Sequence, residues 1–290
     1  MKDLLKFVSI SLLAITLLLV LPCQPSQAEI VRIMAANTSS GNRQAYEDPG
    51  IRIFQGLEPD IVLIQEFSYE QGTIEQLVEN AFGPDAFFHR EDIQGDTENP
   101  LPNGIISLYP IIDRGEIEDN NISNRDFPWV KIDIPGDTDL WVVSVHFKAN
   151  SNSKSRRNAQ ANSLIDELQD LVPPEDYLII GGDFNTSNRS EQALESLDTL
   201  VNTSGPDYPV DSFGDPDTNS SRKKPYDAIY ADVDLEEQEV PVVIGSNIFP
   251  NGLVFDSRVY SPLSEVAPIQ QGDSGVTGMQ HMAVVRDFDF

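Results

Sequence analysis

The sequence predicts an α/β (α+β) fold in which sheets are covered by helices on their outer faces. Short apolar runs bounded by turn residues outnumber the stretches with helical periodicity. Both tight turns and helical crossovers join these runs, and this mixture indicates sheets with helices packed outside. The chain has 290 residues, 40% of them hydrophobic, which suffices for one large domain with a single core; two small domains are the alternative.

The N-terminus has the pattern of a secretory signal peptide. Two early lysines precede an uncharged apolar run over 7–21, and small residues follow up to Ala28. The run is shorter than the roughly 20 residues that a membrane span needs. Cys23 raises a lipoprotein alternative, which the proline before it disfavours. We therefore expect a signal peptide over 1–28 and a mature, cysteine-free domain over 29–290 that is secreted or periplasmic.

The chain carries a large negative charge. Its 47 acidic and 19 basic residues give a formal net charge of −28. Such a surface repels polyanions at long range, although salt screens this repulsion within about 10 Å at 0.1 M. It also disfavours tight non-specific binding of nucleic acid, which depends on neutralisation of phosphates by Lys and Arg. The simpler interpretation is a soluble or salt-adapted surface without bearing on a site.

The first half of the chain predicts strands and helices in alternation. In order, these are a strand over 30–36, a helix over 48–57 with proline in its first turn, a strand over 60–66, a helix that opens at a capping box of Thr73 and Gln76, a polar loop over 91–103 and a strand over 104–109.

The second half begins with an antiparallel pair and the clearest amphipathic helix. The predicted elements are strands over 129–134 and 140–146, a helix over 161–172, a strand over 178–180, a helix over 190–201, a long loop over 202–225 and strands over 226–231, 240–244 and 282–288. A loop of that length is usually functional or mobile.

The stretch 177–185 combines a buried strand with chemically active residues. Gly181 and Gly182 allow the backbone to turn and to approach a ligand closely. In an extended backbone, Asp183 and Asn185 would point to the same side. An acceptor and a donor placed together suit a metal-bound or proton-losing water beside a phosphate oxygen. An Asx-turn, in which these side chains bond their own backbone, is the alternative.

Polar residues also close other apolar strands along the chain. Each would carry a desolvation cost if it were not used, and this makes chance a poor explanation for the whole set. The residues are Asn37, Glu66, His146, Asp183, Asn185, Asp227 and His281.

With these motifs, the sequence resembles the endonuclease/exonuclease/phosphatase superfamily, the metal-dependent phosphodiesterases that include deoxyribonuclease I. The resemblance runs from Val31 to Phe288 and is carried by "PDIVLIQE", "VVSVHF", "GGDFN", "PYDAIY" and "QHMAVV". It implies a deoxyribonuclease I-like, four-layered α/β sandwich, with two packed mixed sheets flanked by helices and the site at one edge of the sheets.

The resemblance implies a catalytic role for five side chains. Asp183 would orient or deprotonate the attacking water, and Asn185 would hold a phosphate oxygen. His281, kept charged and oriented by Asp227, would donate to the scissile phosphate, and His146 would do likewise from the other side. Two imidazolium donors and a metal would together neutralise the charge that develops on the phosphate.

The resemblance also implies a metal site. Glu66 would be the principal ligand of Mg²⁺, which prefers hard oxygen ligands, and Asn37 would help to hold the metal or the phosphate. Mn²⁺ is an alternative ion, and Ca²⁺ is an alternative with a structural role. The family usually ends in Asp-His where this chain has Gln280 before His281, which leaves a second metal position open. Asp273 is the nearby carboxylate that would compensate.

Two arginines are candidates for substrate phosphate binding. Arg125 matches a family arginine near the phosphate, and Arg222 opens the basic cluster just before Asp227. Lys154, Arg156 and Arg157 form a second basic cluster; both clusters have solvated loop charges as the alternative.

We expect from these features a secreted, Mg²⁺-dependent endonuclease that acts on extracellular DNA as a monomer, without a stable protein partner or a membrane span in the mature chain. One alternative is a phospholipid or small-molecule phosphodiesterase or phosphatase of the same fold. The other is a non-catalytic binding module, motivated by the glutamine before the last histidine.

Overall fold

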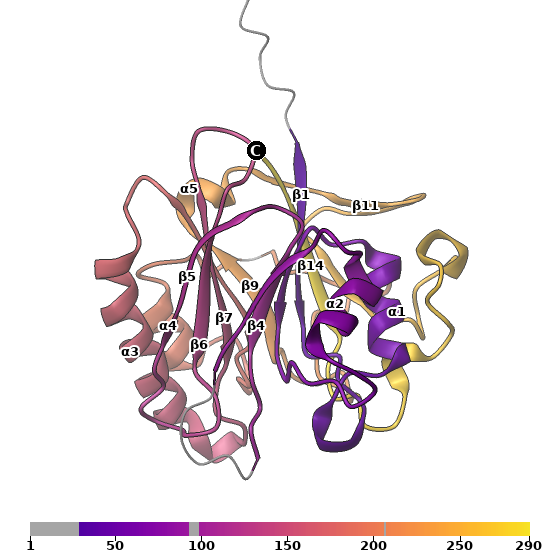
Figure 1. Cartoon of the computed structure of the whole chain (residues 1–290), viewed down its shortest axis with the longest axis horizontal. Helices are drawn as coiled ribbons and strands as arrows, with labels where there is room; N and C mark the ends of the chain where they lie inside the picture. Colours follow the sequence, from indigo (N-terminus) through magenta and orange to yellow (C-terminus); the bar gives the residue numbers. More distant parts are fainter. Residues whose placement is uncertain (1–28, 93–98, 206) are drawn as a thin grey trace, which may run out of the picture.

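The computed structural model describes residues 29–92, 99–205 and 207–290. Two β-sheets pack face to face, and helices cover the outer face of each sheet (Figure 1). The predicted four-layered α/β sandwich is therefore confirmed. The expected signal peptide lies outside the described residues. Among the residues that are described, no helix has the length and apolar character needed to cross a bilayer.

The first sheet combines strands from both ends of the chain. Its order is β10-β14-β1-β2-β4-β3, with β13 also paired to β14. Only β1 and β2 run parallel, and the C-terminal strand β14 lies antiparallel beside β1. The strands are β1 (Ile30–Ala36), β2 (Ile61–Ile64), β3 (Phe87–Arg90), β4 (Gly104–Ser107), β10 (Glu239–Val240), β13 (Leu253–Phe255) and β14 (Ala283–Asp289).

The second sheet has the order β5-β6-β7-β8-β9. Here β7 and β8 are parallel, because the helix α3 crosses over between them, and the other neighbours are antiparallel. The strands are β5 (Ile111–Ile117), β6 (Phe127–Ile132), β7 (Leu140–His146), β8 (Tyr177–Asp183) and β9 (Asp227–Ala231). A separate hairpin joins β11 (Val242–Ile244) to β12 (Asn247–Phe249).

Helices α1 (Asp48–Leu57) and α2 (Ile74–Phe82) cover the first sheet, and α3 (Lys154–Leu171) and α4 (Gln192–Leu197) cover the second. The fifth helix, α5 (Val233–Glu236), is a single turn. The predicted capping box opens α2: the Thr73 hydroxyl accepts from the Gln76 N–H, and the Gln76 side chain accepts from the Thr73 N–H. These bonds satisfy two N–H groups that the helix leaves free.

Three apolar layers hold the sandwich together. Between the two sheets, buried aliphatic side chains such as Ile33 and Leu63 of the first sheet meet Val142 and Ile179 of the second. The outer layers are formed where α1 and α2 pack on the first sheet and where α3 and α4 pack on the second. Burial on both faces explains why the central strands are continuous apolar runs rather than alternating ones.

Most predicted elements are confirmed, with shifts of a few residues at their ends. The strands over 30–36 and 140–146 and the helix over 48–57 have the predicted limits. The helix expected over 190–201 is shorter, Gln192–Leu197. The sequence did not indicate β3, β5, β12 and β13, which are short or rich in polar residues.

Candidate active site

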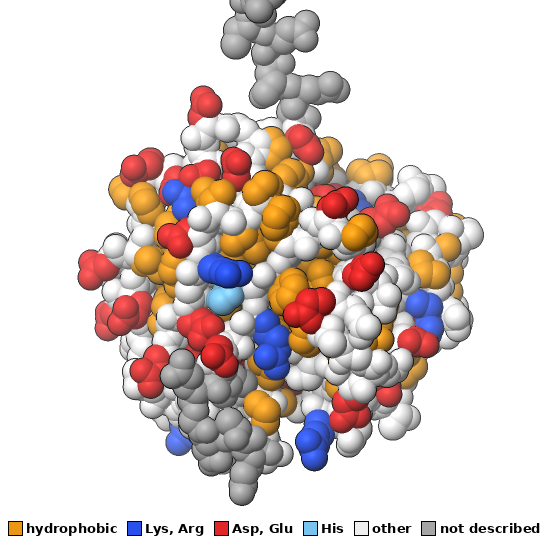
Figure 2. Space-filling model, in the orientation of Figure 1, with side chains coloured by type: hydrophobic (Ala, Val, Ile, Leu, Met, Phe, Trp, Pro, Cys, Tyr) orange, Lys and Arg blue, Asp and Glu red, His pale blue; other side chains and the backbone are white. Residues whose placement is uncertain are grey.

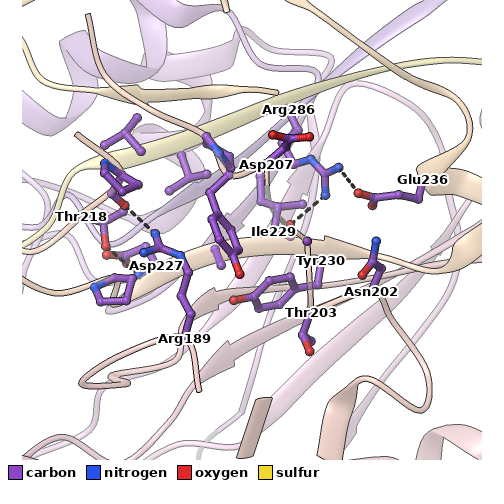
Figure 3. A pocket seen from close by; sticks show the side chains of 18 residues that line it. Arg189, Asn202, Thr203, Asp207, Thr218, Asp227, Ile229, Tyr230, Glu236 and Arg286 are labelled. Carbon is purple, nitrogen blue, oxygen red and sulfur yellow. Dashed lines mark hydrogen bonds and ion pairs between the residues drawn. The ribbon is translucent and has the colours of Figure 1, made fainter. Parts of the chain in front are cut away.

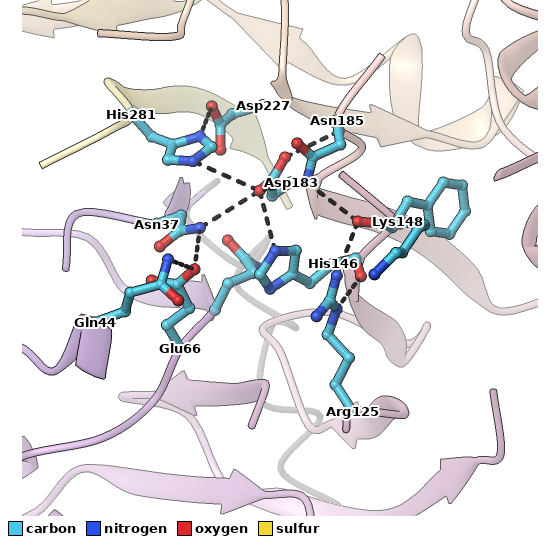
Figure 4. A network of polar contacts seen from close by, with 12 residues as sticks. Asn37, Gln44, Glu66, Arg125, His146, Lys148, Asp183, Asn185, Asp227 and His281 are labelled. Carbon is cyan, nitrogen blue, oxygen red and sulfur yellow. Dashed lines mark hydrogen bonds and ion pairs between the residues drawn. The ribbon is translucent and has the colours of Figure 1, made fainter. Parts of the chain in front are cut away.

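The topology brings the polar strand ends to one edge of the sandwich (Figure 4). Two of them lie directly opposite each other, because the register of the parallel pair β7 and β8 places His146 beside Asp183. The next pair of strands, β8 and β9, places Asp183 beside Asp227. Asn37 follows β1, Glu66 follows β2 and His281 precedes β14, so all the predicted strand-end residues meet here.

The carboxylate of Asp183 lies at the centre of this cluster. Its Oδ2 atom is 3.3 Å from Nε2 of His146 and 3.6 Å from Nε2 of His281. The same oxygen accepts from the side-chain amides of Asn185 at 2.9 Å and Asn37 at 3.4 Å. Asp183 is 1% exposed. A single buried oxygen therefore faces two imidazoles and two amides, which is the position expected of a group that exchanges a proton.

Asn185 reaches Asp183 by a different route from the one that the sequence suggested. Its backbone is not extended, because its φ of 52° lies in the left-handed region. Its N–H donates to Oδ1 of Asp183 at 2.9 Å, which is an Asx-turn, and its side-chain amide donates to Oδ2. The structure thus combines the two alternatives: the turn itself positions the amide beside the carboxylate.

Gly182 allows β8 to pack closely against its neighbours. A Cβ atom at this residue would lie 2.2 Å from the carbonyl oxygen of Val145 and 2.6 Å from the side-chain nitrogen of Gln65. Its φ of 131° is also one that other residues rarely adopt. Gly182 thus brings Asp183 close to β7, and the expected close approach of a ligand to the glycine pair stays a prediction.

His281 is the charged histidine of the site. Burial alone would lower the pKa of His281, but the carboxylates of Asp227, Asp183 and Glu66 outweigh this effect and raise it to about 10. Nδ1 of the ring lies 2.9 Å from Oδ2 of Asp227, so that carboxylate fixes the ring orientation. Burial also raises the pKa of Asp183 to about 7, opposed by His281. The pair provides an acid and a base whose pKa values lie on either side of pH 8.

His146 differs from the expectation of a second imidazolium. Burial and the nearby cations of Arg125, His281 and Lys148 lower the pKa of His146 well below its ordinary value. Its Nε2 atom faces Asp183, and no group within the described ranges bonds its Nδ1 atom. At neutral pH the ring is therefore neutral and can donate only one hydrogen bond, from Nε2, toward the carboxylate.

Glu66 is surrounded by donors from the segment after β1. Its carboxylate accepts from the hydroxyl of Ser39, from the side-chain amide of Asn37 at 3.3 Å and from that of Gln44 at 2.8 Å. Sequence reasoning missed Ser39 and Gln44. Gln44 reaches Glu66 only because its own φ is 57° and that of Arg43 is 51°, and no local sequence pattern indicates such a turn.

The donor set fits a hard divalent cation. Glu66, Asp183 and Asp227 are buried carboxylates at one edge, whereas His281 supplies the balancing charge for only part of the set. Burial raises the pKa of Glu66 as well as that of Asp183, because nearby hydrogen bonds and cations offset only part of the cost of burying the two negative charges. The carboxylate oxygens of Asp183 and Asp227 also lie within 4.8 Å of each other, whereas the protonated ring of His281 has no free nitrogen for an ion. An ion with two positive charges and a preference for oxygen would offset this excess.

Arg125 holds the backbone at the end of β7. Its guanidinium donates to the carbonyl oxygens of His146 at 2.5 Å and Phe147 at 3.1 Å, and the residue is 4% exposed. The two bonds fix the chain that carries His146, and the expected contact of Arg125 with a substrate phosphate stays a prediction.

The guanidinium of Arg222 lies among acidic side chains. Its guanidinium lies 2.9 Å from Asp211, 3.1 Å from Asp256 and 3.5 Å from Asp215, and its side chain is 13% exposed. These three carboxylates neutralise the arginine. The structure gives Arg222 intramolecular partners, and its contact with a substrate phosphate stays a prediction.

Other predicted site residues also have structural partners. Arg157 is fully buried and forms an ion pair with Glu191 at 2.8 Å, whereas Lys154 and Arg156 are exposed. Asp273 binds Arg52 of α1 at 2.7 Å, so it does not replace the carboxylate that is missing at position 280. The side chain of Gln280 is exposed.

Comparisons with known proteins identify a family and a fold for this chain. A model of the Endonuclease/Exonuclease/phosphatase family matches residues 26–248. None of the curated proteins compared matches the chain. Among solved structures, the catalytic domain of human Nocturnin with bound sulfate superposes with a TM-score of 0.61 at 15% identity, over 90% of this chain and 97% of that one.

Two further solved structures have the same fold. The endonuclease/exonuclease/phosphatase from Beutenbergia cavernae DSM 12333 gives a TM-score of 0.57 at 15% identity, over 90% of this chain and 72% of that one. D. rerio TDP2 humanized by 14 mutations gives 0.57 at 14% identity, over 90% and 99%. At such identities these likenesses establish the fold alone.

Proposed function

The chain belongs to the endonuclease/exonuclease/phosphatase family, whose members are hydrolases of phosphate esters, and we propose that it is a secreted, Mg²⁺-dependent phosphodiesterase with DNA as substrate. One observation carries the proposal: Oδ2 of Asp183 lies 3.3 Å from His146 and 3.6 Å from a charged His281. A base and an acid with separated pKa values are the groups that hydrolysis of a phosphodiester requires.

In this proposal, Asp183 is the general base. Its raised pKa makes it a stronger base than an exposed aspartate, and the amide of Asn185 beside it holds a phosphate oxygen. A water between Asp183 and the phosphorus would lose its proton to Oδ2 as it attacks. The bond from phosphorus to one ester oxygen breaks as the new bond forms, and the departing oxygen takes up a proton from solvent. His146, which is neutral at neutral pH, donates from Nε2 and keeps the Asp183 carboxylate oriented.

His281 is the proposed donor to the phosphate. Its ring is held by Asp227 through Nδ1, so the protonated Nε2 is directed toward the centre of the site. A positioned cation and hydrogen-bond donor stabilises the negative charge that develops on the non-bridging oxygens, and such stabilisation is usually the largest single catalytic effect.

A divalent cation would be held by Glu66, with Asn37 and Asp183 beside it. When bound, such an ion polarises the phosphate and neutralises its charge. Ser39 and Gln44 bond the Glu66 carboxylate and restrict its rotation, which prepares it for a ligand role.

The surface charge bears on whether DNA or a smaller phosphate ester is the substrate. Acidic side chains outnumber basic ones on the face shown in Figure 2, and the net charge is −28. This acidity favours a second candidate, a small-molecule or phospholipid-headgroup phosphodiester that needs no long basic track. Nucleic acid would bind through contacts close to the site at moderate ionic strength.

A comparison of substrates distinguishes the two candidate functions. Residues 29–290 are mixed with supercoiled plasmid, with a chromogenic aryl phosphodiester and with choline-phosphate lipid vesicles, each at low and high salt. A DNA enzyme should cleave the plasmid and lose the activity as salt rises, because phosphate contacts weaken with salt. Cleavage of only the aryl diester or the lipid would reassign the substrate and leave the reaction class in place.

A further inference from the structure

A tight turn over 218–224 holds both partners of the buried Asp227 and His281 pair. The hydroxyl of Thr218 accepts from the Asp227 N–H at 2.8 Å, and its carbonyl accepts from the Met282 N–H at 2.6 Å. Thr218 and Asp227 lie together in the wall of a pocket behind β9 (Figure 3). A single residue thus contacts the backbone of Asp227 and that of Met282, which directly follows the proposed donor His281.

The turn continues this contact as a short antiparallel bridge. Asn219 lies opposite His281, and the Ser220 N–H donates to the carbonyl of Gln280 at 2.7 Å. The residues next to His281 in the chain are not helical, and β14 begins only after them, at Ala283. The position of the His281 backbone therefore depends on where the turn is held.

Arg222 at the tip of the turn connects it to the rest of the fold. Its guanidinium contacts three carboxylates, those of Asp211, Asp215 and Asp256, and donates to the Asp215 carbonyl at 3.0 Å. Asp256 directly follows β13, whose Phe255 is paired with Ala283 of β14. The ion cluster thus joins the turn to the end of β13, which pairs with the first residue of β14 just after His281.

The backbone conformation of Arg222 indicates that its contacts with the rest of the fold hold it in place. Its φ is 53°, a left-handed conformation that residues other than glycine keep only where other contacts compensate. Its partners Asp211 and Asp256 are nearly fully buried, and a second arginine, Arg258, shares Asp256. Lys223 beside it is exposed and contributes only its N–H to the turn.

We propose that Arg222 is a positioning residue for His281: through its three carboxylates it fixes the turn 218–224, and the turn fixes the imidazole against Asp227. The inference rests on the proposed function, in which His281 is the phosphate donor. It assigns Arg222 no contact with substrate, so its effect belongs to turnover rather than to binding.

The test compares Arg222→Met and Arg222→Lys with the matched control Lys223→Met, which removes one positive charge from the same turn without touching a carboxylate. Because a displacement of about 1 Å at a reacting group can cost on the order of 10²-fold, we expect Arg222→Met to lower kcat by roughly 10- to 100-fold. KM for plasmid should stay unchanged, Arg222→Lys should lie in between, and Lys223→Met should resemble the wild type.

The hydrogen-bonded ring proton of His281 supplies a readout that does not depend on activity. The chain has only three histidines, so the Nδ1–H resonance can be assigned by comparison with His281→Ala. Arg222→Met should shift or broaden that resonance at constant pH, whereas Lys223→Met should not. Asp215→Asn, at the more exposed member of the cluster, should give a smaller change in the same direction and serves if Arg222→Met fails to fold.

Two results would overturn the proposal. The first is a raised KM for plasmid with unchanged kcat and an unchanged KM for the aryl diester, which would make Arg222 a phosphate contact. The second is an unperturbed ring proton in folded Arg222→Met. If the wild type cleaves no phosphodiester, the proposed function fails, and the ring proton alone decides whether Arg222 positions His281.

Discussion

Oδ2 of Asp227 lies 2.9 Å from Nδ1 of His281, and both side chains are buried. The opposite nitrogen of the same ring faces Asp183 at 3.6 Å. One carboxylate therefore orients the ring, and the other lies at the nitrogen that would act on a phosphate. This arrangement keeps His281 protonated in an environment where burial alone would discharge it.

Asp227→Asn should distinguish the effect of Asp227 on the orientation of the His281 ring from the effect of its negative charge on the pKa of that ring. The amide retains the size of the side chain but removes the first carboxylate that raises the pKa of His281. We expect kcat to fall by roughly 10²- to 10⁴-fold, as for other general acids that lose their function. The alkaline limit of activity should also move to lower pH. A pH–rate profile of the variant measures both effects; a profile that matches the wild type would exclude Asp227 from the mechanism.

The pH dependence of the wild type follows from the two shifted groups. Asp183 acts as a base only when deprotonated, so kcat/KM should rise as the pH passes the pKa of Asp183, which burial raises to about 7 and which a bound Mg²⁺ would lower. His281 acts only when protonated, so kcat/KM should fall as the pH passes about 10. Initial rates between pH 5 and 11 at saturating Mg²⁺ measure this bell-shaped curve. A maximum below pH 6 would contradict the assignment of the base.

Glu66→Gln tests the metal site without relying on activity. Burial raises the pKa of Glu66, so a neutral side chain should not lower the melting temperature in chelator. Ligand at 100 times its Kd stabilises a fold by about 2.7 kcal/mol, or roughly 5–10 °C for a chain of this size. The wild type and the exposed control Glu79→Gln should show this rise with Mg²⁺, and Glu66→Gln should not. A full rise in Glu66→Gln would place the ion elsewhere.

Arg157→Met should destabilise the fold. Arg157 is fully buried, pairs with Glu191 at 2.8 Å and donates to the carbonyls of Lys148 and Asn150. Its removal leaves a buried carboxylate unpaired, which costs about 3–5 kcal/mol in the free energy of unfolding. The adjacent exposed arginine is the control, because Arg156→Met should change stability by no more than about 0.5 kcal/mol. Urea unfolding followed by circular dichroism compares the two; equal midpoints would refute the structural role.

Much of the fold could be predicted because its central strands are buried on both faces. Continuous apolar runs such as 30–36 and 140–146 leave few alternatives to a buried strand, and the capping box at Thr73 locates α2. The edge strand β5 escaped prediction because Asp113, Arg114 and Glu116 interrupt its apolar pattern, which a strand with a solvated edge tolerates.

The strand-end residues of the site were predictable for a related reason. A polar side chain at the end of a buried strand is conspicuous, and parallel neighbours bring such ends together, as His146 and Asp183 illustrate. Ion-pair and hydrogen-bond partners that lie far apart in the sequence cannot be predicted in this way. Arg222 and Arg125 follow plausible basic patterns, but only the folded chain determines that carboxylates and carbonyls, respectively, occupy their guanidinium groups.

Cleavage of supercoiled plasmid by residues 29–290, with Mg²⁺ and with chelator, tests most directly whether the edge around Asp183 is a metal-dependent phosphodiesterase site. The expected result is nicking that requires the metal and falls by orders of magnitude in His281→Ala, with the fold of the variant intact by circular dichroism. Nicking that persists in both chelator and His281→Ala would contradict the site. Absence of cleavage of plasmid, aryl diester and lipid alike would contradict the enzyme itself.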